Sequence, residues 1–574
     1  MSSPRHTIAF FLGILCLATV LRILWPGHLQ IEHFDEGVYA SGFFAGHLDN
    51  RFPDQQLYAP PLFPAMAEWA LILCSSAVQA PLWLSVLLGI ALVVASYWAA
   101  REWFDESTAL AAAMLVATSD FTILFSRAAL TDTPLCLWLT LGLVAGSRGL
   151  RTGGVLWIIL GALFAALGWW TKYNGWLCPA ILGAGLLGWT LWERPPLAIC
   201  RSAWLRWLLF TALTFALWLP LLWNLAPYGG YAAVAANHRG YFGGFPLWPE
   251  AFVRQFLVQQ HLTGYASGAG IYALWIWLWF MQSRQQFSLG MEASAPLVAI
   301  SLPLLIVGTG IWALIPVGLI ALWFDRRRQP GTPEDQSPLR VLPYWILLAW
   351  LASLMLAVPL YRPYPRLQLP LIVAICIAGA RGLVLMVRHL RSSASHAHLI
   401  TRYGVPALLL ALSLGSIVLR GGPPSTVAWE SRAGLHQIAL QTQQDLPHWL
   451  KDRPASQVLP LECLVYVLAE PGLFYQLAAL EQHGTASYVT QPASNLGMLE
   501  PGKSDHRLPN LLLTGPHAHR DHPELLSSPP PQLILLKEVP YHESQLVLLD
   551  DMSPAEAART PPSVVRIWAI DSGR

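Results

Sequence analysis

Apolar stretches of bilayer-spanning length recur along the first 420 residues of this chain. A transmembrane helix needs about 20 predominantly apolar residues to cross the hydrocarbon core. Only 12% of the 574 residues are charged, which is about half the fraction typical of soluble proteins. The sequence therefore predicts an all-α polytopic membrane protein, with apolar windows near 7–25, 82–100, 108–126, 133–147, 153–170, 174–192, 203–223, 342–360, 367–388 and 403–420.

The segment between 268 and 324 allows two interpretations. It holds either three short spans, near 270–282, 294–308 and 309–324, or one long span after a surface helix. Both alternatives give an odd number of crossings, so the total is about 11–13 transmembrane helices and the later orientation is unaffected. The first window lacks a small-residue cleavage site and is predicted to be retained. The apolar stretch Pro61–Ser76 is predicted to lie along the outer interface, since a crossing there would invert every later loop.

Basic residues gather in alternate loops. Cytoplasmic loops of membrane proteins carry an excess of Lys and Arg, which sets the orientation of the chain. A cytoplasmic N-terminus makes the loops self-consistent, so we predict a multi-pass protein of the plasma (inner) membrane. The inner side then receives Arg5, Arg101, Arg148, Arg151, Arg194, Arg201, Arg206, Arg326, Arg327, Arg328, Arg340, Arg388, Arg391 and Arg402.

The composition changes after residue 420. Short β-like runs appear near 457–468, 532–538 and 564–570, with a helical pattern at 430–451. We therefore predict two domains, a transmembrane domain over 1–420 and an extracytoplasmic α/β domain over 421–574. The seven cysteines form neither a disulfide framework nor a metal-binding spacing. The net charge of +2 gives no indication of a nucleic-acid partner.

Four basic residues break the charge-sidedness rule. Arg127, Lys172, Arg362 and Arg366 each stand at the predicted outer end of an apolar helix. Cations beside hydrocarbon are costly and often mark a ligand, and guanidinium groups match phosphate oxygens well. The cluster predicts a site for a phosphate or pyrophosphate at the membrane surface. The alternative is that these side chains extend to lipid headgroups.

Acidic residues occupy the same predicted side. The first outer loop contains the adjacent carboxylates Asp35 and Glu36, which suit a general base and a group that holds the acceptor or a metal. Asp132 stands at the outer start of a helix, where the helix dipole favours an anion. The alternatives are that the pair is simply solvated and that Asp132 only caps its helix.

These segments resemble a known family. Phe34-Asp35-Glu36-Gly37-Val38-Tyr39-Ala40 resembles the Asp-Glu loop motif of the dolichyl-phosphate-mannose protein mannosyltransferases and of their bacterial relatives, the aminoarabinose transferases that modify lipid A. Four further segments resemble family elements in the same order: Tyr58–Pro64, Ser126–Leu135, Trp170–Gly175 and Arg366–Pro370. The resemblance covers about residues 7–390.

The resemblance implies a GT-C fold and an inverting glycosyltransferase that uses a polyprenyl-phosphate sugar. The acceptor is a protein, a lipid or a glycan on the extracytoplasmic face. Asp35 would be the general base, Glu36 would orient the acceptor, and Arg127, Lys172 and Arg366 would surround the donor phosphate. From their positions in the sequence we add Asp132 to the catalytic residues and Arg362 to the phosphate site. We expect Tyr39, Tyr58 and His238 to contact the acceptor or to hold the loops.

The sequence departs from the lipid A-modifying relatives at two places. An acidic residue and a Lys before the Pro-Pro pair are replaced by Tyr58 and Ala59, and a Glu-His pair reads Asn237-His238. These changes argue against an aminoarabinose transferase. We expect no required metal or other cofactor, with a divalent metal near the Asp35–Glu36 pair or His238 as the alternative.

Two other classes of protein compete with a transferase. A transporter or lipid-carrier flippase would show broken helices in paired halves and charged residues near the midplane, whereas these charges gather on one side and no repeat is evident. A non-catalytic membrane scaffold would use its C-terminal domain to bind a partner. A polyprenyl-phosphate sugar should stabilise the transferase against unfolding but not the scaffold.

Overall fold

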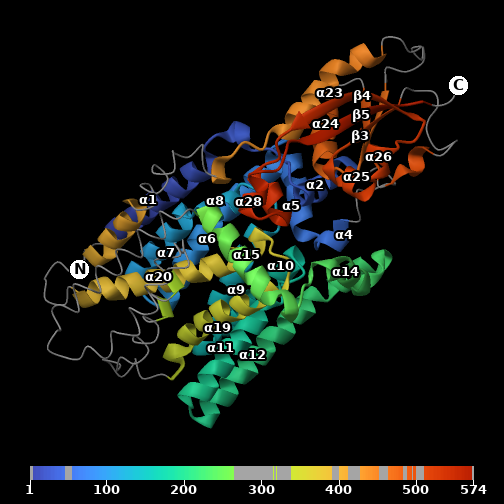
Figure 1. Ribbon diagram of the computed structural model, residues 1–574. Helices are drawn as coiled ribbons and strands as arrows, with labels where there is room; N and C mark the ends of the chain where they lie inside the picture. Colours follow the sequence, from blue (N-terminus) through green and yellow to red (C-terminus); the bar gives the residue numbers. More distant parts are fainter. Residues whose placement is uncertain are drawn as a thin grey trace.

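The computed structural model describes a helical bundle that carries a small sheet domain at one end (Figure 1). The alternatives between 268 and 324, the end of the window at 403–420 and the predicted boundary at 420 lie largely or wholly outside the described residues. These are 4–45, 55–75, 77–263, 314–315, 318–319, 338–390, 400–411, 427–450, 463–482, 488–493, 495–499 and 510–571.

The predicted apolar windows up to 223, and those at 342–360 and 367–388, coincide with helices. In the described part of the chain, five helices are long and apolar enough to cross a membrane, or six if one bent pair counts as a span. The predictions of a helical, multi-pass membrane protein are therefore confirmed. The bundle contains α1 (Pro4–Ile23), α6 (Ala80–Trp103), α7 (Glu106–Thr118), α8 (Asp120–Ser126), α9 (Asp132–Thr152), α10 (Val155–Thr171), α11 (Leu177–Glu193), α12 (Leu197–Trp218), α19 (Leu342–Ala357) and α20 (Leu369–Leu390).

The window at 108–126 is two helices rather than one. α7 and α8 meet at an angle of 62°, with Ser119 extended between them. The break frees backbone carbonyls of α7, and the guanidinium of Arg22 on α1 donates to those of Val116 (3.2 Å) and Ala117 (3.1 Å). A side chain inserted into the hydrogen-bond ladder accounts for such a kink. A window of hydropathy carries no signal for a partner on another helix.

Charged groups mark the two ends of the bundle. At one end, Glu102 accepts hydrogen bonds from Arg148 (3.0 Å) and Arg151 (2.6 Å), which join the last turn of α6 to α9. These residues belong to loops predicted to face one side. The opposite end carries α2 (Phe34–Ala40), α3 (Gly42–Ala45), α4 (Gln55–Tyr58), α14 (Gly230–His238), α15 (Trp248–Thr263) and α5 (Leu62–Leu73), a helix too short to cross a bilayer.

The C-terminal domain is built on a five-stranded sheet of order β2-β1-β3-β5-β4. The strands β2 and β3 run parallel to β1, whereas β5 is antiparallel to both β3 and β4. Every residue of β1 and β3 is buried, which is typical of parallel strands covered on both faces. The predicted α/β character is confirmed by β1 (Cys463–Leu468), β2 (Tyr488–Ala493), β3 (Asn510–Thr514), β4 (Leu533–Tyr541), β5 (Ser563–Ile570), α23 (Gly434–Leu450) and α24 (Pro471–Gln482).

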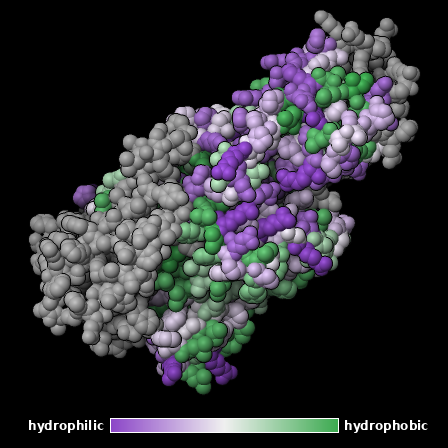
Figure 2. All heavy atoms as spheres, in the orientation of Figure 1, coloured by the Kyte–Doolittle hydropathy of each residue, from purple (hydrophilic) through white to green (hydrophobic). Residues whose placement is uncertain are grey.

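The C-terminal domain docks directly on α2. A Cβ added at Gly37 would overlap the backbone of Gly472 at the start of α24, so only glycine fits. Around this contact, Gln476 Nε2 donates to the carbonyl of Ile31 and Tyr475 Oη donates to that of Val78, both over 2.8 Å. Figure 2 shows mainly hydrophilic residues at the junction of this domain with the bundle, hydrophilic residues with hydrophobic patches between them on the domain itself, and hydrophobic residues along the helices below.

Candidate active site

Helix α2 directs two neighbouring carboxylates to different places. Nδ1 of His33 accepts a hydrogen bond from the backbone N–H of Asp35 (3.1 Å), and the Glu36 carboxylate accepts one from the backbone N–H of His33 (3.0 Å). This capping box satisfies N–H groups at the helix start and fixes its first turn. The carboxylate of Asp35 then meets Arg366, whereas that of Glu36 meets Arg432.

Asp35 is held ionised at a partly open position. Arg366, just before α20, donates to its Oδ2, and the buried hydroxyl of Tyr39 lies 3.5 Å from the same atom. The two ion-paired side chains remain 14% and 13% exposed. Burial alone would raise the pKa of Asp35, but the positive charges of Arg366 and, farther away, Lys172 outweigh it and hold that pKa below the ordinary value.

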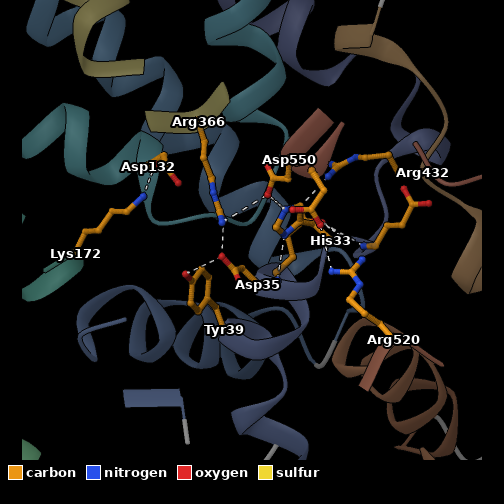
Figure 3. A network of polar contacts seen from close by, with 12 residues as sticks. His33, Asp35, Tyr39, Asp132, Lys172, Arg366, Arg432, Arg520 and Asp550 are labelled. Carbon is orange, nitrogen blue, oxygen red and sulfur yellow. Dashed lines mark hydrogen bonds and ion pairs between the residues drawn. The ribbon is translucent and has the colours of Figure 1, made fainter. Parts of the chain in front are cut away.

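A second ion pair faces the same space. Nζ of Lys172, at the end of α10, lies 2.5 Å from Oδ1 of Asp132, the first residue of α9. Oδ2 of Asp132 is buried and has no hydrogen-bond partner among the described residues. Arg366 also lies 3.6 Å from Asp550 of the C-terminal domain. We call Asp35, Asp132, Lys172, Arg366 and Asp550 the site cluster (Figure 3).

Aromatic and imidazole side chains surround the site cluster. Tyr58 is half-buried, and burial together with nearby Tyr241 and Asp35 raises its pKa to about 12, so its hydroxyl stays protonated. His238 donates from Nδ1 to the carbonyl of Val234 (2.9 Å), and burial lowers its pKa, so its other ring nitrogen is free to accept a hydrogen bond at neutral pH. Arg362 is exposed, with its guanidinium 5.8 Å from the Tyr241 ring centre.

Two predicted site residues belong instead to a buried group. Glu36 is fully buried and accepts from Arg432 (2.8 Å) and from the backbone N–H of Ala129 (2.7 Å). Arg127 is 2% exposed and donates to two carbonyls at the end of α1, both over 2.7 Å. We call Arg22, Glu36, Arg127 and Arg432 the sealed cluster. The structure therefore places neither Glu36, predicted to orient the acceptor, nor Arg127, predicted to contact the donor phosphate, in the site cluster.

The chain is similar in part of its sequence and in its fold to known proteins. Residues 82–232 match the profile of the dolichyl-phosphate-mannose-protein mannosyltransferase family. The fold is similar to that of ArnT from Cupriavidus metallidurans over 98% of both chains, at 15% sequence identity. The TM-score is 0.54 for ArnT bound to undecaprenyl phosphate and 0.55 for its apo state. No curated protein matches the chain by sequence.

The chain has the GT-C fold. The family match and this fold together confirm the predicted class, a membrane glycosyltransferase, over the transporter and the scaffold. Within the GT-C fold, the first outer loop, the start of α9, the end of α10 and the segment before α20 meet at one end of the bundle, as the order of the motifs predicted.

Sequence reasoning missed the contribution of the C-terminal domain to this GT-C site. Asp550 accepts from Nε2 of His33 (2.7 Å), and Arg432 pairs with Glu36. Both partners lie hundreds of residues away in sequence from α2. The one signal available was that the acidic loop and the C-terminal domain were predicted on the same side of the membrane.

The described residues contain no group of three or more His, Cys, Asp or Glu side chains arranged to hold a metal ion. The basic groups of the site cluster occupy the space between the carboxylates instead, as Arg366 does between Asp35 and Asp550. Independence of a metal remains a prediction.

Proposed function

We propose that this chain transfers a sugar from a polyprenyl-phosphate carrier to an acceptor at the extracytoplasmic face of the plasma membrane. One observation carries the proposal: an ionised carboxylate, Asp35, shares a partly open site with two cations, Arg366 and Lys172. The site stands at the end of an apolar bundle, where a prenyl tail lies in lipid and its phosphate reaches the cations. The ArnT structure with undecaprenyl phosphate supports a donor of this kind.

The donor phosphate competes with the carboxylates for the cations. Arg366 is paired with Asp35, and Lys172 is paired with Asp132. A phosphate that accepts hydrogen bonds from Arg366 and Lys172 loosens both pairs. Asp35 then loses the partner that lowers its pKa and becomes a better base. Donor binding thus prepares the base for the acceptor.

Transfer is a single displacement. Asp35 takes the proton of the acceptor nucleophile while that atom attacks the anomeric carbon from the side opposite the phosphate. The bond between the anomeric carbon and the phosphate oxygen breaks, and its electron pair leaves with the polyprenyl phosphate. Negative charge grows on the phosphate in the transition state, where the fixed cations stabilise it most. The products are an acceptor glycoside with inverted configuration and a protonated Asp35.

The remaining features of the proposal follow from the sequence. The N-terminus is cytoplasmic and the C-terminal domain extracytoplasmic, because Arg148 and Arg151 lie at the end of α9 opposite Asp132 and the site cluster, and basic residues favour the cytoplasmic side. The acceptor is a protein, a lipid or a glycan. Arg366 and Lys172 supply the positive charge at the phosphate, so the reaction needs no divalent metal.

The test uses the full-length protein in lipid nanodiscs. Undecaprenyl phosphate should raise the melting temperature, whereas undecaprenol, which lacks the phosphate, should not. Incubation with hexose- or pentose-linked undecaprenyl phosphate and a cell-envelope fraction should release undecaprenyl phosphate. Mass spectrometry should then find an envelope component that has gained one sugar. Equal stabilisation by undecaprenol, or no release from any donor, would overturn the proposal.

A further inference from the structure

The C-terminal domain places one carboxylate in the site cluster. Asp550 lies at the end of α27 (Gln545–Asp551), and its side chain is 14% exposed. Its Oδ2 meets both Nε2 of His33 (2.7 Å) and Nη2 of Arg366 (3.6 Å). Its neighbour Asp551 points elsewhere and pairs with Arg520 (3.2 Å) at the surface. Two adjacent aspartates on one helix therefore differ in whether they reach the site.

The contact with His33 fixes the helix that carries Asp35. Nδ1 of His33 accepts from the backbone N–H of Asp35, so the proton of a neutral ring is on Nε2, which donates to Asp550. The ring thus links a carboxylate of one domain to the helix start of the other, and the orientation of an imidazole is set by such partners. Replacing the carboxylate removes the charged half of this link.

The contact between Asp550 and Arg366 places the Arg366 guanidinium between two carboxylates, those of Asp35 and Asp550. Nη1 of Arg366 meets Asp35 and Nη2 faces Asp550 (Figure 3). When a donor phosphate replaces Asp35 as the hydrogen-bond partner of Arg366, the guanidinium still has Asp550 as an anionic neighbour. Asp550 therefore keeps the cation in the site while its other edge changes partner.

Backbone contacts hold α27 in register with the acidic loop. The N–H of Ser544 donates to Glu32 (3.2 Å), which precedes His33 in the loop, and the N–H of Gln545 donates to Glu430 (2.8 Å). Together with the close approach of Gly37 and Gly472, these contacts fix Asp550 relative to α2. The position of Asp550 is therefore a property of the docked domain.

We infer that Asp550 is a positioning residue for transfer, which holds Arg366 and His33 so that Arg366 can turn from Asp35 to the donor phosphate. The transfer site is then shared between the two domains. This inference rests on the proposed function and adds to it a required contribution from the C-terminal domain.

The test compares Asp550→Asn with Asp551→Asn, which removes the same charge one residue away. Release of undecaprenyl phosphate from the sugar-linked donor is measured for both purified full-length variants across a range of pH. Asp550→Asn should lower kcat/KM by about 10–100-fold, since small displacements of reacting groups have effects of this size. Its acidic limb should move to lower pH, because Asp35 loses a nearby negative charge. Asp551→Asn should match the wild type.

Each outcome decides between the alternatives. A purely structural role for Asp550 would reduce the yield or the melting temperature and leave the pH limb in place, which would overturn the inference, as would equal kinetics for the two variants. If Asp550→Asn does not fold, Asp550→Glu decides. It keeps the charge but moves the oxygens, so it should give a kcat/KM below the wild type, and wild-type kinetics would overturn the inference. An inactive wild type would instead contradict the proposed function.

Discussion

Asp35 and Glu36 are neighbours in sequence, yet they belong to two ion clusters with opposite properties. In the site cluster, four of the five side chains are partly exposed, and the fifth, the buried Asp132, has a carboxylate oxygen with no hydrogen-bond partner among the described residues. In the sealed cluster, Glu36 is inaccessible and its two oxygens accept hydrogen bonds from Arg432 and from backbone N–H groups. Buried charges with such partners stabilise one arrangement of the chain, whereas accessible ones remain able to exchange partners with a ligand.

The largest expected effect is the loss of turnover in Asp35→Asn, which distinguishes Asp35 from its neighbour Glu36. Asp35→Asn keeps the shape of the side chain but removes the base, so kcat should fall by about 10³-fold or more. The melting temperature should stay close to that of the wild type, because Arg366 retains Asp550. The assay is release of undecaprenyl phosphate beside a thermal unfolding curve. Wild-type turnover in Asp35→Asn would contradict the assignment of the base.

The opposite result is expected for Glu36→Gln. Arg432 would keep its charge in a buried place without a carboxylate partner, and breaking a buried ion pair costs about 3 kcal/mol or more. The variant should show a lower melting temperature and a lower yield, and its turnover should be measured per folded molecule. A normal melting temperature with a lost turnover would place Glu36 in catalysis and break the distinction between the two clusters.

Arg127→Met tests the sealed cluster from its other side. The carbonyls of Arg22 and Leu24 would lose a charged donor inside the protein, which should cost about 2 kcal/mol of stability. The donor KM of the folded fraction should not change, since Arg127 is 2% exposed. A raised donor KM at an unchanged melting temperature would return Arg127 to the donor phosphate, as the sequence predicted.

Lys172→Met tests whether the site cluster binds the donor phosphate. Loss of one charged hydrogen bond to the phosphate should raise the donor KM about tenfold, with a smaller change in kcat. Lys537→Met is the matched control, because Lys537 forms a similar ion pair with Asp445 in the C-terminal domain, away from the site. Equal donor KM values for the two variants would remove Lys172 from the phosphate site.

The smallest effect concerns pH. The pKa of Asp35 is lowered in the folded protein, so its ion pair contributes stability above the ordinary pKa of about 3.9 that is lost as the pH falls through the lower folded value. In the ligand-free protein, the melting temperatures of the wild type and of Asp35→Asn should keep a constant difference from pH 7 to about 5. A difference that changes within this range would show that the ion pair with Arg366 is absent in solution.

The sequence predicted the parts of this molecule that local patterns determine. The apolar windows predicted the helices of the bundle, and the segment that forms the short α5 was predicted to lie along the membrane interface rather than to cross the bilayer. The break at Ser119 was not predictable, because the side chain that bonds the freed carbonyls, Arg22, lies on another helix. Arg127 and Arg366 look alike in sequence, each at the end of an apolar window, and only burial separates them. Asp550 could not be assigned because its partners depend on how two domains dock.

The glycine contact between α2 and α24 has a mechanical consequence. Since Gly37 and Gly472 meet through their backbones, no deformable side chain separates the two domains at that point. A displacement of the C-terminal domain would therefore act directly on the backbone of α2, and Asp35 lies two residues from the contact. A molecule that tilts the C-terminal domain would therefore also move Asp35, the proposed base.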